Sequence, residues 1–185
     1  MSVLGRQGNI GISRFDLKPN SKNPKILDIG CGMNPAPDAN VIMDINPDIG
    51  REFKDKKFVR HNANDIPFPF KDSTFDYIYL NNVIEHLTCE DGLLFKELKR
   101  ILKIYGKAEI HCPNSLFIYH RFLYFIGIIP CDFMLCHIKH YSFQQLKHNL
   151  RNAGFKIFEL NNLWLFNPIK NFIYPHIKII VKKGS

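Results

Sequence analysis

Four short polar motifs in this sequence each follow an apolar run, and their residue types suit a ribose and an adenine. Residues 28–32 read Asp-Ile-Gly-Cys-Gly, and glycines at this spacing let the backbone approach a ligand closely. Asp44 ends the next run, where a carboxylate could accept hydrogen bonds from both hydroxyls of a ribose. Residues 62–65, Asn-Ala-Asn-Asp, could read an adenine edge, and Asn81 and Asn82 close the fourth run. Each motif alone could be a turn or a helix cap, but their coincidence at four successive strand ends favours one ligand site.

The elements that must position these motifs follow from the hydrophobic pattern. Residues 91–105 carry apolar side chains at spacings of three and four, which predicts an amphipathic helix ended by Gly106. A second helix is predicted over 142–153, with Ser142 as its N-cap and Gly154 closing it. Short apolar runs bounded by turn residues predict seven strands, at residues 25–29, 41–43, 57–60, 75–80, 107–111, 155–160 and 176–181.

Strands that alternate with helices on short connections predict an α/β fold. We expect a single-domain, three-layer Rossmann-like sandwich around a mostly parallel seven-stranded sheet with an antiparallel edge strand. The domain should span residues 25–185, preceded by an N-terminal extension, 1–24, that is rich in Gly, Asn, Ser and Lys. Residues 33–40 contain two prolines, so the crossover helix usual after the first strand must be vestigial.

Composition narrows the class of protein. The five cysteines form no C-x-x-C pair, which predicts a reduced, cytoplasmic protein without a disulfide framework. The longest apolar stretch, 116–136, is interrupted by charged residues and proline, so no transmembrane segment is expected. The net charge is +8, and residues 137–185 hold eight basic side chains against the single acidic Glu159. This basic third could meet RNA or another phosphate, or it could be a solvated lysine face.

The motifs together resemble one known family, the class I S-adenosylmethionine-dependent methyltransferases. The likeness covers about residues 25–158 and rests on the glycine motif at 26–32, on 66–76, on Val-Ile-Glu-His-Leu at 83–87 and on 100–106. It implies S-adenosylmethionine as cofactor, with Gly30 and Gly32 beneath its methionine part. The implied cofactor contacts are Asp28, Gly30, Cys31, Gly32, Asp44, Ile45, Asn62, Ala63 and Asn81.

The resemblance also assigns roles and exposes departures. It implies that Asp28 holds the glycine loop or the amino group of the cofactor, and that Asp44 holds the ribose. Asn62 would meet the adenine amino group, Ala63 would offer its backbone N–H to the ring, and Asn81 would line the pocket near the methionine carboxyl. The family pattern has a third glycine where Asn34 stands, a residue able to adopt positive φ. It has Pro-Gly where Ile104 and Tyr105 stand.

Methyl transfer from a sulfonium is an in-line displacement, so positioning supplies much of its acceleration and a general base need not exist. A hydroxyl acceptor would still gain from a base, and His86, His111 and His140 are the candidates; each could instead be structural. Cys131, Cys136, His137 and His140 form C-x4-C-H-x2-H, but the spacing is unusual for zinc and the neighbours are core-like. No metal site is therefore predicted.

An aromatic insertion, residues 115–137, follows the fifth strand at the place where members of the resembling family bind their acceptors. We expect it to act as a lid, although a helix that merely packs on the sheet would have the same composition. The predicted function is methyl transfer to a small-molecule, sugar or lipid-linked acceptor. A methyltransferase acting on tRNA or another RNA is the alternative within the enzyme class. A non-catalytic S-adenosylmethionine-binding or regulatory protein is the alternative outside it.

Overall fold

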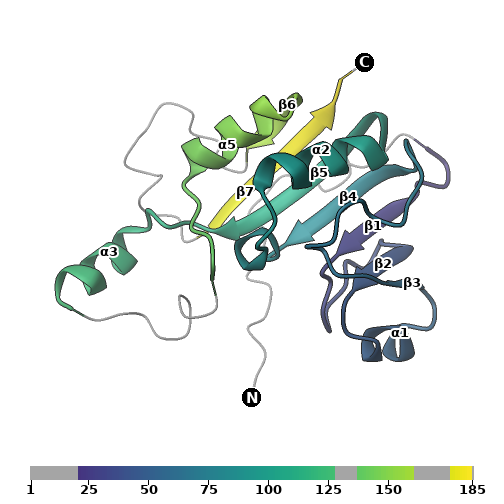
Figure 1. Cartoon of the computed structure of the whole chain (residues 1–185), viewed down its shortest axis with the longest axis horizontal. Helices are drawn as coiled ribbons and strands as arrows, with labels where there is room; N and C mark the ends of the chain where they lie inside the picture. Colours follow the sequence, from purple (N-terminus) through teal and green to yellow (C-terminus); the bar gives the residue numbers. More distant parts are fainter. Residues whose placement is uncertain (1–20, 128–136, 161–175, 185) are drawn as a thin grey trace.

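A computed structural model describes residues 21–127, 137–160 and 176–184 of the chain (Figure 1). Most of the predicted N-terminal extension, part of the aromatic insertion, and both Cys131 and Cys136 lie outside the described residues. The elements in chain order are β1 (Ile26–Ile29), β2 (Val41–Asp44), α1 (Asp48–Glu52), β3 (Lys57–Arg60), β4 (Phe75–Asn81), the 3-10 turn η1 (Ile84–His86), α2 (Asp91–Ile101), β5 (Leu102–Pro113), α3 (Ile118–Phe125), α5 (Phe143–Asn152), β6 (Phe155–Leu160) and β7 (His176–Lys183).

The strands form one seven-stranded sheet in the order β3-β2-β1-β4-β5-β7-β6. Strands β1 to β5 pair in parallel, whereas β7 runs antiparallel to both of its neighbours, β5 and β6. The predicted mostly parallel sheet is thus confirmed, with its antiparallel strand at one end, one position in from the edge. Because the first five strands are parallel, the polar motifs that follow β1, β2, β3 and β4 all emerge at the same edge.

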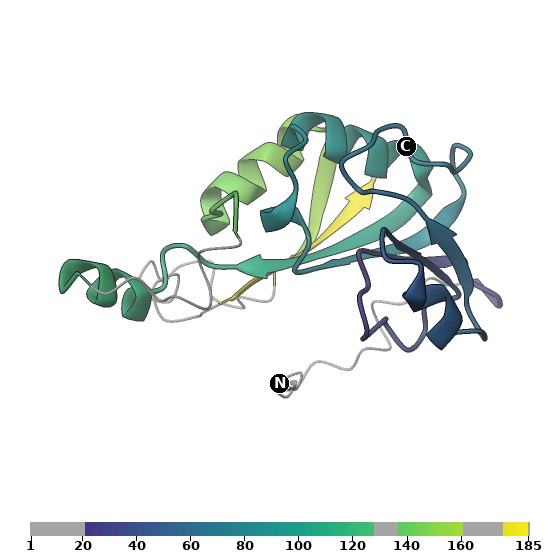
Figure 2. The ribbon, with the colours of Figure 1, turned by 60° about the horizontal axis from the view of Figure 1, so that its bottom comes forward.

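Helices cover both faces of the sheet and complete the three layers. Helices α2 and α5 lie together over one face, and α1 lies on the other (Figure 2). The alternation of side chains along each strand supports this division, because Leu27 and Ile29 belong to the larger core cluster while Ile26 belongs to the smaller one. Among the described residues, no helix is long and apolar enough to cross a membrane.

The predicted end of the first long helix was wrong. Helix α2 ends at Ile101, and Gly106 lies within β5 rather than closing the helix. Glycine is required there because a Cβ would lie 2.9 Å from the carbonyl oxygen of Lys103, and the left-handed residue is Tyr105, at φ 65°. Positive φ in the first motif falls on Gly30 and Gly32, and Asn34 does not adopt it. The absence of a helix at 33–40 is as predicted.

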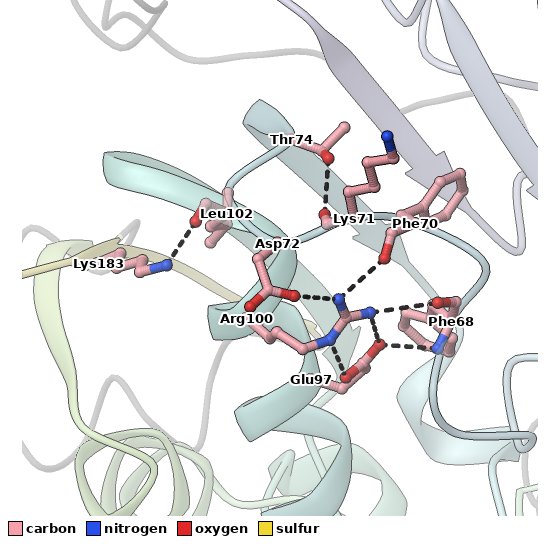
Figure 3. Close-up of polar contacts among 9 residues, drawn as sticks. All are labelled: Phe68, Phe70, Lys71, Asp72, Thr74, Glu97, Arg100, Leu102 and Lys183. Atoms are coloured by element: carbon pink, nitrogen blue, oxygen red, sulfur yellow. Dashed lines mark hydrogen bonds and ion pairs between the residues drawn. The ribbon is translucent and has the colours of Figure 1, made fainter.

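A partly buried ion pair between Arg100 and Glu97 fixes the segment that connects β3 to β4 (Figure 3). Arg100 at the end of α2 donates to both carboxylate oxygens of Glu97, at 2.8 and 2.6 Å, and to Asp72 at 2.6 Å. The same guanidinium donates to the carbonyl oxygens of Phe68 and Phe70, and the Phe68 N–H donates to Glu97 at 2.7 Å. Both carboxylate oxygens of the buried Glu97 thus have hydrogen-bond partners. We call this cluster of Arg100, Glu97 and Asp72 the Arg100 clamp.

Candidate functional site

The loop after β1 lies at the carboxyl edge of the sheet, which we call the ligand edge, and a ligand could approach its backbone closely. Gly30 and Gly32 have φ of 61° and 51°, a conformation that disfavours other residues. A Cβ on Gly30 would lie 2.8 Å from Val83, whereas a Cβ on Gly32 would meet nothing within 4 Å. Asp28 is buried and its Oδ2 accepts a hydrogen bond from Ala36 N at 2.7 Å, which holds the loop in place. The Gly32 side of the loop is therefore open to a ligand.

Asp44 at the end of β2 braces this loop. One carboxylate oxygen accepts from Gly32 N and the other from Asn46 N, both at 2.9 Å. Each oxygen can accept a further hydrogen bond, so the carboxylate is oriented by the backbone and still able to bind a hydroxyl pair. Ile45, the next residue, is largely exposed and could cover an apolar ring beside it.

The segment after β3 is also held in place by its own side chains. Asn62 Oδ1 accepts from Asn64 N at 3.0 Å, and Ala63 packs against the larger core cluster. Asn64 Oδ1 accepts from the backbone N–H groups of Thr88 and Cys89, which ties this segment to the chain beyond η1. The predicted adenine contact from Asn62 would use the second lone pair of its oxygen.

The end of β4 and the thiol in the glycine motif complete the edge. Asn81 is partly exposed and pairs in register with His111 of β5, while Asn82 takes φ 55° and donates its N–H to the His111 carbonyl oxygen.

Burial, followed by the nearby Asp28 and Asp44 carboxylates, raises the pKa of the Cys31 thiol to about 12. Cys31 is therefore a neutral lining group and cannot act as a thiolate nucleophile at physiological pH.

Comparison with known proteins identifies the family of this chain. The profile of a methyltransferase domain matches residues 11–160. The chain belongs to this methyltransferase family. An uncharacterized protein of Methanocaldococcus jannaschii is 40% identical over 101 residues, which span 52% of this chain and 44% of that protein. The chain thus covers less than half the length of that relative.

Solved structures show the same fold. An S-adenosylmethionine-dependent methyltransferase from Methanosarcina mazei has a TM-score of 0.66 at 16% identity, covering 95% of this chain and 99% of that one. One from Archaeoglobus fulgidus has a TM-score of 0.62 at 20% identity, covering 88% and 87%. The chain thus has the fold of S-adenosylmethionine-dependent methyltransferases. The individual cofactor contacts remain predictions for this methyltransferase.

The three candidate histidines lie in different places. His86, in η1, stacks edge-on against His137 with ring centroids 4.8 Å apart. His111, in β5, stacks face to face on His176 at 4.9 Å, and His140 is exposed beside the isolated bridge between Asn114 and Tyr141. The structure therefore brings His86 together with His137 rather than with either other candidate.

Sequence reasoning missed Glu85 as a possible functional residue. Its side chain is buried, yet within the described part of the chain neither carboxylate oxygen receives a hydrogen bond. Its backbone carbonyl accepts from the N–H groups of Ile138 and Lys139, which brings His137 against η1. The signal available in the sequence was the Glu-His pair itself, placed directly after a strand that ends at the ligand edge.

Proposed function

We propose that this methyltransferase transfers the methyl group of S-adenosylmethionine to a small-molecule, sugar or lipid-linked acceptor that has an apolar part. The observation that carries the choice of acceptor is α3. This helix follows β5 and stands away from the sheet in both views (Figures 1 and 2). Its Phe122 and Phe125 side chains are 59% and 88% exposed, and Ile118 is exposed beside them. Exposed rings on the helix that follows β5 suit an apolar acceptor better than a charged backbone.

Three lysines of the basic C-terminal third, all in β7, make contacts within the chain itself. Lys178 pairs with Glu109 at 2.8 Å, and Lys183 donates to the Leu102 carbonyl oxygen at 2.6 Å. Lys182 lies over the ring of Tyr105, 4.9 Å from its centroid. These contacts partly neutralise or shield the charges of β7, which supports an acceptor other than RNA.

The residues of the ligand edge fit the cofactor. The open side of Gly32 admits the methionine part, and the Asp44 carboxylate is oriented for the ribose hydroxyls. The cofactor supplies an electrophilic methyl group on a sulfonium, so the protein has to bind and orient the two reactants and exclude water. Asp44, Gly32 and the Asn62 segment would bind and orient the cofactor. Helix α3 would exclude water from the acceptor.

Cofactor binding is tested by Asp44→Ala. Loss of a charged hydrogen-bond acceptor should weaken S-adenosylmethionine binding by about 1.5–3 kcal/mol, roughly ten- to a hundred-fold in calorimetry. Asp48→Ala, which removes an exposed carboxylate of α1 paired with Arg51, is the matched control and should bind normally. Equal affinity in both variants would show that Asp44 does not hold the cofactor.

The acceptor is tested with methyl-labelled cofactor and cell extract fractionated into RNA, glycan, lipid and small-molecule pools. We expect label in a pool other than RNA. Phe122→Ala and Phe125→Ala should then lower turnover about tenfold or more without changing cofactor affinity, because they remove apolar contact area of the acceptor site. Phe158→Ala, an exposed ring on β6, should have no effect. Labelling of RNA with a steep salt dependence, and full activity of both α3 variants, would contradict the proposal.

A further inference from the structure

We propose that Glu85, His86 and His137 form a binding site for a divalent transition-metal cation at the ligand edge of the sheet. One ligand atom from each of the three side chains lies within 4.8 Å of the others. A carboxylate with two imidazoles is a common protein ligand set for such ions, and three protein ligands leave positions open for another molecule. The C-x4-C-H-x2-H pattern in the sequence pointed to a different set, which shares only His137 with this one.

The strongest reason is the carboxylate of Glu85. The residue is 1% exposed, and within the described residues its nearest ion-pair partner is His86, with Nε2 4.0 Å from Oε1. Burying a carboxylate without hydrogen bonds costs several kcal/mol. A divalent cation at this position would bind the carboxylate and offset that cost.

The two histidines suit the same ion. The rings of His86 and His137 lie against each other, with centroids 4.8 Å apart. Neutral imidazole is the form that binds metals, and the metal gives two adjacent rings a shared partner. The His86 side chain is 41% exposed, so an ion can enter from solvent on this side.

Backbone and side-chain hydrogen bonds outside the ligand atoms fix this geometry. Besides the two N–H groups that donate to the Glu85 carbonyl, Asp91 at the start of α2 gathers three side chains from the segment that carries His137 and from α5. Lys139 Nζ and the Tyr141 hydroxyl both donate to Asp91 Oδ1 at 2.7 Å, and Asn149 donates to Oδ2 at 3.0 Å. The three ligands are thus held near one another by the fold, as a metal site requires.

The ligand types restrict which metal ion the site would bind. Two nitrogen ligands and one oxygen favour zinc, manganese, iron, cobalt or nickel over magnesium and calcium, which prefer oxygen ligands. Bonds of about 2.0–2.2 Å to such an ion place neighbouring ligand atoms roughly 3 Å apart. Small rotations of the His86 and His137 side chains would close the present separations.

The position of the metal site beside the cofactor loop suggests a role in methyl transfer, and this step rests on the proposed function. Turn η1 follows β4, and Val83 packs directly behind Gly30, so an ion here would lie beside the cofactor loop. It would bind the oxygen of an acceptor hydroxyl and lower its pKa. The proton passes to water, the oxygen forms a bond to the methyl carbon, and the carbon–sulfur bond breaks with its electron pair left on sulfur.

Metal binding is tested on the full, untagged chain after chelator treatment. Titration with Co²⁺, followed by its visible absorption, and with Zn²⁺, followed by calorimetry, should show one ion per chain. Glu85→Gln, His86→Ala and His137→Ala should each weaken binding at least about tenfold. His148→Ala, which removes an exposed histidine of α5, is the control and should bind normally. Thermal unfolding confirms that each variant is folded.

Two outcomes would overturn the site. One is an absence of stoichiometric binding by the folded wild-type chain. The other is a thiolate-to-cobalt absorption band that disappears in Cys131→Ser while Glu85→Gln binds normally, which would place the ion on the cysteine-containing set. S-adenosylmethionine affinity, measured on the same variants without metal, should stay unchanged. Loss of cofactor affinity in Asp44→Ala but not in Glu85→Gln therefore separates the metal site from the proposed function.

Discussion

Glu97 and Glu85 are both buried, with 6% and 1% of their surface exposed, but their carboxylates meet opposite surroundings. Glu97 lies in the Arg100 clamp, where a guanidinium and a backbone N–H satisfy both of its oxygens. Glu85 lies in η1, and no described residue donates a hydrogen bond to either of its carboxylate oxygens. Its ion-pair partner among the described residues is His86, whose Nε2 lies 4.0 Å from Oε1. The Glu97 carboxylate thus stabilises the fold, whereas the Glu85 carboxylate is available to bind the proposed cation.

The difference follows from the cost of burying charge. A paired carboxylate recovers most of its lost hydration from its partners, whereas an unpaired one shifts toward its neutral form. A fold that is only marginally stable retains an unpaired buried carboxylate where a function depends on it. The contrast between these two glutamates therefore separates scaffold from site more directly than burial alone does.

The largest expected change in the free energy of unfolding comes from a substitution in the Arg100 clamp. Arg100→Ala leaves Glu97 buried without its charged partner, which should lower the free energy of unfolding by about 3 kcal/mol. Urea denaturation followed by circular dichroism measures this loss. Arg51→Ala breaks an exposed pair with Asp48 and should cost less than about 0.5 kcal/mol. Similar losses in the two variants would mean that burial does not strengthen the clamp.

A smaller effect of the opposite sign is expected at Glu85 in metal-free protein. Burial raises the pKa of this carboxyl in the folded state, so the folded state holds the proton at pH values where the unfolded state has released it. Stability should therefore fall as pH rises from the ordinary carboxyl range through the raised pKa. Glu85→Gln removes that fall and should be more stable than wild type at pH 7, by roughly 1 kcal/mol.

The control for this prediction is the same substitution in the clamp. Glu97→Gln weakens the pair with Arg100, so it should lower stability at pH 7 where Glu85→Gln raises it. Denaturation curves between pH 4 and 8 measure both variants. If Glu85→Gln were as destabilising as Glu97→Gln, the contrast between the two carboxylates would be wrong.

Much of the fold and part of the site could be predicted from the sequence. Strands such as β3 and β6 were predicted at their observed bounds because short apolar runs between turn residues have few alternatives. The end of α2 was predicted wrongly because Leu102 fits a helix face and a buried strand equally well, and because Gly106 serves close packing rather than a helix end. The motifs at the strand ends came together because parallel strands share an edge.

The cluster of Glu85, His86 and His137 could not be predicted in the same way. His137 lies about fifty residues beyond His86 in the chain, and no periodicity connects them. Their contact depends on backbone hydrogen bonds to the Glu85 carbonyl and on the anchoring of the following segment by Asp91. Contacts of this kind are set by tertiary packing, and residue types alone carry little record of them.

The smallest expected effect tests that anchoring. Tyr141→Phe removes one hydrogen bond to Asp91 but leaves the bond from Lys139, so stability should fall by only about 0.5–1 kcal/mol. Because the hydroxyl helps hold the segment that carries His137, Co²⁺ affinity should fall several-fold as well. Tyr79→Phe is the matched control, since it removes a tyrosine hydrogen bond to Asp38 on the other face of the sheet. It should show a similar small loss of stability with unchanged Co²⁺ affinity, and equal metal affinities in the two variants would show that Asp91 does not position His137 through Tyr141.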